Sequence, residues 1–250
     1  MIKRGLSFEE MVVSTRDDKE FRVAKEFVEN LFFDMAKMST KYCNKLFCDL
    51  PYTYRERALE SIMLPVLSKM CNNLVLVEIP VTRKCDNRRF YVEKSSGRID
   101  FWCIYNNYTI IIELKHSFDC FTTPNTRERV VTNQWLKVNE QLESIKDDVK
   151  EFVEETKGII RIGLHVITSY SDKPQNRKKL ISQFTAKIPD TFKRFAKDLS
   201  KPYSSLKPDL MICWKIPPRI VMDERQDGTF AGLWCIAKIY STLRHQGAVK

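Results

Sequence analysis

The stretch Arg98–Lys115 (RIDFWCIYNNYTIIIELK) constrains the fold more than any other part of this chain. Two runs rich in β-branched and aromatic residues flank Asn106 and Asn107, and asparagine tolerates the positive φ that a tight hairpin turn requires. The pattern predicts a β-hairpin in which these two asparagines form the whole turn. Tyr105 then lies opposite Tyr108.

The second strand of this hairpin is apolar on both faces, because Ile110, Ile111 and Ile112 follow one another. Such a run is typical of a strand that is covered on both sides of a sheet. We therefore expect the hairpin to lie inside the molecule. The alternative is an edge hairpin whose charged residues face solvent.

The register of the hairpin brings two acidic residues together. Asp100 falls opposite Glu113, and Lys115 lies two residues beyond Glu113 on the same face. Directly opposed residues have Cβ atoms roughly 4.5–5.5 Å apart, and like charges in such a pair are destabilising. The pair therefore predicts a positive partner between the carboxylates, and a divalent metal ion with Lys115 beside it would fill that role.

Asp100, followed by Glu113-Leu114-Lys115 on the next antiparallel strand, resembles the PD-(D/E)xK nuclease superfamily. The resemblance covers residues 52–168, and Ile99 stands where that family often has proline. It implies a restriction-endonuclease-like core, hydrolysis of phosphodiester bonds and a Mg²⁺ cofactor, with Mn²⁺ as a substitute.

The resemblance also implies a role for each site residue. Asp100 and Glu113 would hold the metal ion together with the main-chain carbonyl of Leu114, and oxygen ligands are those that Mg²⁺ prefers. Glu60, on the preceding predicted helix, would supply a third carboxylate; the alternative is a solvated residue on the flank of that helix. Lys115 would orient the attacking water and offset the charge that develops on the phosphate.

Hydrophobic periodicity predicts the remaining elements. Helices are expected at 17–38, 52–70, 133–155 and within 176–199, and strands at 74–82, 159–168, 210–214 and 230–240. The order helix, strand, strand, strand, helix, strand predicts an α/β fold with a central mixed β-sheet flanked by helices. We expect a single nuclease-like domain over 1–250, with an N-terminal helical extension (1–50), a core (51–216) and a C-terminal hairpin strand and tail (217–250).

Several segments and residues are predicted to have no catalytic role. Residues 1–16 are expected to be an irregular lead-in. The polar stretch 116–129 is expected to be a loop, long enough to close over a substrate. His116 and His165 are interpreted as structural residues. Asp209 follows a proline and so repeats the first half of the motif, but no [DE]xK follows on a neighbouring strand, and we assign it to the start of a strand.

The net charge points to a polyanionic partner. The 42 Lys and Arg exceed the 32 Asp and Glu, which gives +10, and a surplus of that size favours association with nucleic acid. The basic residues predicted to contact phosphates are Arg83, Lys84, Arg88, Arg89, Lys193, Lys197 and Lys201. The alternative for each group is a solvated surface.

The cysteines and the hydropathy of the sequence indicate in which cellular compartment the protein is expected. The eight cysteines are scattered and form no CxxC pair, so the sequence predicts no zinc site. It contains no signal-peptide pattern and no apolar run long enough to span a membrane. We expect a reducing cytoplasm and no membrane partner.

The function predicted from the sequence is a metal-dependent nuclease. DNA is the expected substrate, and an endonuclease in a defence or restriction setting is expected by analogy alone. Two alternatives stay open: a nucleic-acid-binding module with an inactive nuclease fold, and an RNA nuclease. A homodimer is compatible with the sequence.

Overall fold

The computed structural model describes residues 2–3, 6–43, 51–54, 56–83, 95–123, 128–145, 156–171, 176–217 and 229–241. Its helices are α1 (Lys19–Tyr42), α2 (Glu56–Met70), α3 (Glu128–Ser144) and α4 (Arg177–Asp198), with short 3-10 turns η2 (Pro51–Thr53) and η5 (Ser204–Leu206). Its strands are β1 (Ile2–Lys3), β2 (Leu6–Val12), β3 (Val75–Arg83), β4 (Ser95–Tyr105), β5 (Tyr108–Cys120), β6 (Ile159–Ser171), β7 (Leu210–Lys215) and β8 (Thr229–Ser241).

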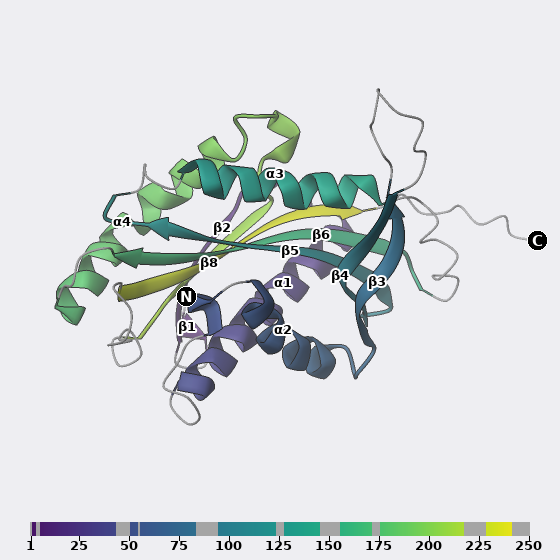
Figure 1. Cartoon of the computed structure of the whole chain (residues 1–250), viewed down its shortest axis with the longest axis horizontal. Coiled ribbons are helices and arrows are strands. Elements are labelled where there is room, and N and C mark those ends of the chain that lie inside the picture. The colour runs from purple at the N-terminus through teal and green to yellow at the C-terminus, as the bar shows by residue number, and fades with distance from the viewer. Residues whose placement is uncertain are drawn as a thin grey trace, which may run out of the picture.

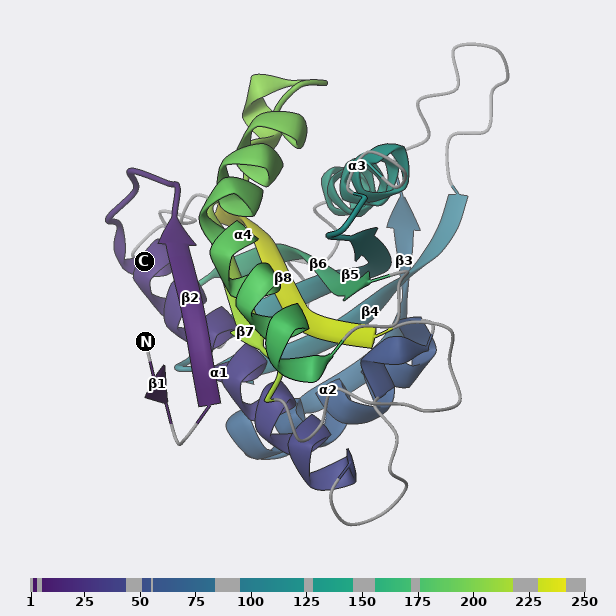
Figure 2. The same cartoon turned by 90° about the vertical axis from the view of Figure 1, so that its left-hand side faces the viewer.

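All of the described strands join one eight-stranded sheet, in the order β1-β2-β7-β8-β6-β5-β4-β3. Strands β5 and β6 are parallel, and the other neighbours are antiparallel. Helices α3 and α4 cover one face of the sheet, and α1 and α2 cover the other (Figures 1 and 2). The predicted α/β class, a central mixed sheet flanked by helices, is confirmed.

The predicted core order is present as α2-β3-β4-β5-α3-β6. Strands β3, β4 and β5 form an antiparallel meander, α3 crosses over the sheet, and β6 returns parallel to β5. A parallel neighbour requires such a crossover, because the chain has to return to the same end of the sheet. In Figure 1, β3 and β4 bend away from the direction of the other strands at one end of the molecule.

The central hairpin has the predicted turn and register. Asn106 and Asn107 adopt left-handed conformations, with φ of 49° and 65°, and Tyr105 pairs with Tyr108. The three isoleucines of residues 110–112 are fully buried. The prediction of a strand covered on both faces is therefore confirmed.

The N-terminal segment differs from the prediction. Residues 6–12 are not an irregular lead-in but form β2, which pairs with β7. Phe8 is fully buried and packs edge-on against Phe32 and Phe33 of α1. The adjacent acidic residues Glu9-Glu10 interrupt the apolar alternation in the sequence, and this concealed the strand.

The C-terminal strand is also part of the main sheet. β8 lies between β7 and β6 and pairs with both. Asp209 immediately precedes β7, and its Oδ2 accepts the Ile239 N–H of β8 at 2.8 Å. The position of Asp209 at the start of a strand agrees with its assignment from the sequence.

β5 runs through the first part of the polar stretch 116–129, so the prediction of a loop there is wrong as far as Cys120. The polar side chains of this part are bonded inside the molecule. Ser117 Oγ lies 2.8 Å from His165 Nε2, and Asp119 Oδ2 accepts from Arg194 Nη2 at 2.7 Å. Polar residues that are satisfied internally look like loop residues in a sequence.

Two helices have observed boundaries that differ from the predicted ones, and the difference at α2 affects the site. α2 was expected from Tyr52, but it begins at Glu56, after the turn η2. The predicted helix 133–155 is observed as Glu128–Ser144, and residues 146–155 lie outside the described ranges. No helix in the described part of the chain combines the length and hydrophobicity of a membrane span.

Candidate active site

β4 and β5 separate at Asp100. Their ladder ends with the pair Phe101–Ile112, and the Asp100 carboxylate then takes the place of a backbone partner, because its Oδ2 accepts the Leu114 N–H at 2.6 Å. On the neighbouring strand β3, Glu78 lies in the left-handed region at φ 55°. The sheet is therefore irregular at the residue to which the resemblance assigns a metal.

The Lys115 ammonium lies at this opening. Its Nζ donates to the Leu114 carbonyl at 2.7 Å and lies 3.4 Å from Glu56 Oε1. The other oxygen of Glu56 accepts the His116 N–H at 3.2 Å. Glu56 is the first residue of α2, so the start of this helix is bonded to the edge of β5 that β4 has left.

Acidic residues gather around this contact and repel one another. Burial raises the pKa of the Glu56 carboxyl; the Lys115 ammonium opposes that shift, and the charge of Asp100 adds to it. Burial also raises the pKa of Glu60. The negative charges of Asp100, Glu56 and Glu78 act on Glu60 in the same direction. A cation among these carboxylates would relieve the repulsion.

Glu113 lies on the face of the sheet that α3 covers. It is buried, with 1% of its surface exposed, and it pairs with Gly163 of β6. A side chain at Gly163 would meet Leu142 and Asn139 of α3, and paired residues in a ladder point to the same face. Asp100, by contrast, reaches β5 from the side of β4. Whether both carboxylates share one ion stays a prediction.

The donor set fits a hard divalent cation, although its side chains have not converged on one point. Carboxylates of Asp100 and Glu56 and the Leu114 carbonyl are the oxygen donors that Mg²⁺ prefers. Among the residues described, no three His, Cys, Asp or Glu side chains form a group that could hold a metal ion as they stand. The Lys115 ammonium bonds to the same Leu114 carbonyl, so it and a metal ion would compete for that oxygen.

The two histidines next to this site are buried or partly buried and form hydrogen bonds within the sheet. His116 Nε2 lies 2.9 Å from Thr168 Oγ1, and that hydroxyl donates to the Tyr52 carbonyl at 2.7 Å. Burial lowers the pKa of His116 to about 4. His165 is fully buried beside Trp135, and burial lowers its pKa to about 3. Both rings are therefore neutral at pH 7, in agreement with their structural interpretation.

The structure places only part of the predicted basic residues. Arg83 ends β3, and its side chain lies outside the description, as do all of Lys84, Arg88 and Arg89.

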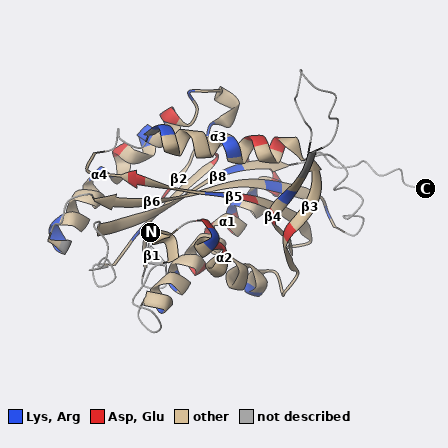
Figure 3. Ribbon diagram, in the orientation of Figure 1, with Lys and Arg blue, Asp and Glu red and all other residues tan. Residues whose placement is uncertain are grey.

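The basic residues of α4 are described, and Figure 3 shows Lys and Arg residues at several points along this helix. Lys193 and Lys197 are exposed on α4, one turn apart. Lys201 lies after the end of the helix, and its Nζ is 2.7 Å from Asp198 Oδ1. The expected three-lysine face is therefore continuous only over its first two members. Arg194, also on α4, forms an ion pair with the buried carboxylate of Asp119.

Glu56 is the site residue that the sequence analysis missed. Its spacing of four from Glu60 was the available signal, because residues four apart lie on one helix face. The helix was expected to begin at Tyr52, which made Glu56 an interior residue rather than the first. Its role depends on contacts with β5, and no local pattern reports such contacts.

Glu56→Gln and Glu60→Gln are each expected to weaken Mg²⁺ binding by about tenfold or more, as loss of residues around a metal site does. Both native pKa values lie above the usual 4.5. The stabilisation from these carboxyls is therefore complete below about pH 4.5 and is lost as the pH rises through the raised values. At pH 7 the metal-free Glu60→Gln variant should unfold at the wild-type temperature or above it, and it should gain less from Mg²⁺.

Thermal unfolding across a Mg²⁺ titration measures both effects. Glu140→Gln, at an exposed position of α3, is the matched control and should behave as wild type. If Glu60→Gln responds to Mg²⁺ as the wild type does, Glu60 is a solvated residue on the flank of α2 and not a metal ligand.

Comparison of the chain with protein-family models, with curated proteins and with solved structures found no match. The functional assignment therefore rests on the residues and contacts of this chain.

Proposed function

We propose that this chain is a metal-dependent nuclease that hydrolyses phosphodiester bonds in DNA. One observation carries the proposal, and it lies where two antiparallel strands separate: the Asp100 carboxylate bonds to the Leu114 N–H, and the Lys115 ammonium bonds to the Leu114 carbonyl and contacts Glu56. The core α2-β3-β4-β5-α3-β6 supports it, because the same order of elements belongs to the nuclease superfamily that the motif resembles. An endonuclease in a defence setting, a cytoplasmic location and a homodimer are the wider parts of the proposal, and they rest on analogy and composition.

In this mechanism, Asp100 and Glu113 would hold a Mg²⁺ or Mn²⁺ ion with the Leu114 carbonyl, and Glu56 and Glu60 would add negative charge from α2. The ion would lower the pKa of a bound water and stabilise negative charge on the phosphate. The Lys115 ammonium can donate to an attacking water and can also offset charge on a phosphate oxygen. Its ammonium has to leave the Leu114 carbonyl to do so.

One observation favours the alternative of a nucleic-acid-binding module with an inactive nuclease fold. The Lys115 ammonium bonds to the carbonyl of the proposed ligand Leu114, and Glu113 lies on the face of the sheet that α3 covers. A chain that kept this arrangement would bind nucleic acid through its basic surface without cleaving it.

A cleavage assay separates these functions. Purified protein is incubated with circular DNA, linear DNA and RNA, each with Mg²⁺, with Mn²⁺ and with EDTA. Cleavage of circular DNA that requires the metal supports the proposal, and cleavage of RNA alone assigns an RNA nuclease. Binding without cleavage of any substrate would support the module.

Replacement of the α4 lysines tests how the chain holds nucleic acid. Lys193→Ala with Lys197→Ala should weaken DNA binding and lower the slope of log affinity against log salt by roughly 0.9 per lost duplex phosphate contact. Adding Lys201→Ala should change the slope less, because Asp198 already neutralises that ammonium.

Salt titrations of binding to a labelled duplex in EDTA provide the slope. Lys37→Ala with Lys41→Ala gives a matched control, since these exposed lysines are also four residues apart, on α1. A slope equal to that of wild type in the Lys193→Ala, Lys197→Ala variant would show that this face of α4 does not contact the DNA backbone.

A further inference from the structure

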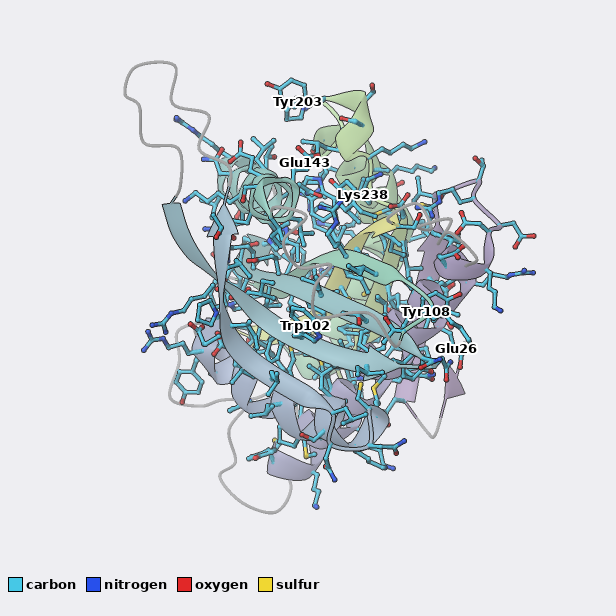
Figure 4. The ribbon with its side chains drawn as sticks, turned by 90° about the vertical axis from the view of Figure 1, so that its right-hand side faces the viewer. Glu26, Trp102, Tyr108, Glu143, Tyr203 and Lys238 are labelled. Carbon is cyan, nitrogen blue, oxygen red and sulfur yellow. The ribbon has the colours of Figure 1, made fainter. Side chains whose placement is uncertain are left out.

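Arg98 and Glu78 form an exposed ion pair beside the candidate active site. Arg98 Nη1 lies 3.2 Å from Glu78 Oε2, and the two side chains are 68% and 49% exposed. Arg98 comes two residues before Asp100 on β4, and Glu78 lies on β3 between residues that pair with β4 on either side of Asp100. Figure 4 views this side of the molecule, where Trp102 marks β4 two residues after Asp100.

The backbone holds Glu78 in place at a cost. A residue other than glycine in the left-handed region is destabilised by roughly 1–2 kcal/mol, and such residues persist only where their surroundings determine them. Ile79 and Val81, which follow Glu78, pack against the buried cluster that contains Ile99 and Ile111. Packing of these partly buried neighbours holds the β3 backbone directly after Glu78.

This ion pair lies in the same electrostatic environment as the acidic site. The charge of Glu78 acts on Glu60 of α2 together with the charge of Asp100. A phosphate that approaches Asp100 therefore meets several carboxylates that repel it. The Lys115 side chain is 13% exposed and its ammonium already contacts Glu56, so it does little for a phosphate that is still outside the site.

Arg98 has the chemistry to offset this repulsion. Its guanidinium is planar, permanently charged and carries five donors, which suits bidentate binding of a phosphate. The exposed contact with Glu78 is weak in water, so a phosphate can replace it at low cost. Asp100 and Arg98 belong to one strand, so a phosphate held by Arg98 is held at a fixed distance from the site.

We propose that Arg98 is a substrate-positioning residue that binds a backbone phosphate beside the scissile bond, and that Glu78 is a built-in competitor that holds the guanidinium until nucleic acid arrives. This inference rests on the proposed function for the identity of the substrate. It assigns the phosphate contact beside the scissile bond to β4, in addition to the contacts predicted from the sequence at residues 83–89 and on α4.

A double-mutant cycle in EDTA tests the proposal without any cleavage. The probe is a fluorescein-labelled DNA duplex, and the full-length variants are Arg98→Ala, Glu78→Gln and the double variant. Arg98→Ala should weaken binding about tenfold, the typical loss for one hydrogen bond to a charged group. Glu78→Gln should tighten binding in the wild-type background and should have no effect once Arg98 is absent.

Arg22 and Asp17 of the α1 region provide the matched control. They form an exposed pair away from the site, with the Arg22 Nε and Asp17 Oδ1 atoms 3.9 Å apart and side chains 65% and 85% exposed. Arg22→Ala and Asp17→Asn should leave the affinity at the wild-type value. Arg98→Lys should recover part of the affinity, because the charge returns but the bidentate geometry does not.

The outcomes distinguish this inference from the proposed function. Wild-type affinity in Arg98→Ala overturns the inference, even where the wild type cleaves DNA with Mg²⁺. Equal tightening by Glu78→Gln with and without Arg98 also overturns it, since the effect is then one of overall charge. With Mg²⁺, a positioning role predicts a raised KM in Arg98→Ala with kcat little changed. If the wild type cleaves no substrate but Arg98→Ala weakens DNA binding, the phosphate contact of Arg98 is supported and the nuclease function is rejected.

Discussion

Lys115→Ala and Lys115→Arg are each expected to lower the rate of Mg²⁺-dependent DNA cleavage by about 10²–10³-fold, the typical loss on removing one donor that stabilises a transition-state charge. The reason is that the ammonium lies between two close oxygen partners, 2.7 Å from the Leu114 carbonyl and 3.4 Å from Glu56 Oε1. A guanidinium is wider and planar, and it keeps its proton, so it cannot occupy the same point beside a metal ion and a water. Conservation of charge alone should therefore not rescue cleavage.

DNA affinity in EDTA should change little in both Lys115 variants, because the Lys115 side chain is mostly buried. Lys37→Arg on α1 serves as the control for a lysine-to-arginine change at an exposed position. Thermal unfolding of each variant checks the fold, since Lys115→Ala also removes the partner of Glu56. Cleavage by Lys115→Ala at the wild-type rate would falsify the placement of the active site.

The hairpin could be predicted from the sequence because its determinants are local. Asn106 and Asn107 specify the turn by their tolerance of positive φ, and the turn fixes the register of both strands. The isoleucines of residues 110–112 indicate burial on both faces without reference to any other element. These features gave the strand pairing and the place of β5 in the interior of the sheet.

The register could not predict where the ladder ends. Perfect pairing places Asp100 directly opposite Glu113, but β4 leaves β5 one pair earlier, and the Asp100 side chain bonds to Leu114 instead. The neighbouring strand β3 is irregular at the same level, where Glu78 has a φ of 55° and the β3–β4 register skips Glu78 and Asp100. A sequence pattern assumes regular strands and therefore treats every facing pair alike.

Internally bonded polar residues concealed other parts of the fold. Ser117 and Asp119 extend β5 because His165 and Arg194 satisfy their side chains. These partners come from β6 and α4, far along the chain. The site residue Glu56 was missed for the same reason, since its importance lies in bonds to Lys115 and to the His116 N–H. Local patterns predict elements well where the partners are local, and they fail where polar groups are satisfied from a distance.

Asp100→Asn and Asp100→Ala should both lose Mg²⁺-dependent cleavage, by about 10²-fold or more if a transition-state contribution of typical size is removed, but they should differ in stability. The Asp100 carboxylate has a structural task as well as the proposed catalytic one, because Oδ2 accepts the Leu114 N–H at 2.6 Å. Asparagine keeps an acceptor at that position. Alanine leaves the N–H of a buried residue without this partner, at a cost of about 1–3 kcal/mol.

Urea unfolding without metal separates the two tasks. Asp100→Asn should be close to wild type in stability. It also removes a negative charge that repels phosphate and acts on Glu56 and Glu60. We expect equal or tighter binding to a labelled duplex in EDTA. Asp190→Asn, at an exposed position of α4, controls for the loss of one charge. A variant Asp100→Asn that cleaves DNA as fast as wild type would show that Asp100 only closes the end of the β4–β5 ladder, and the metal site would then have to be sought elsewhere.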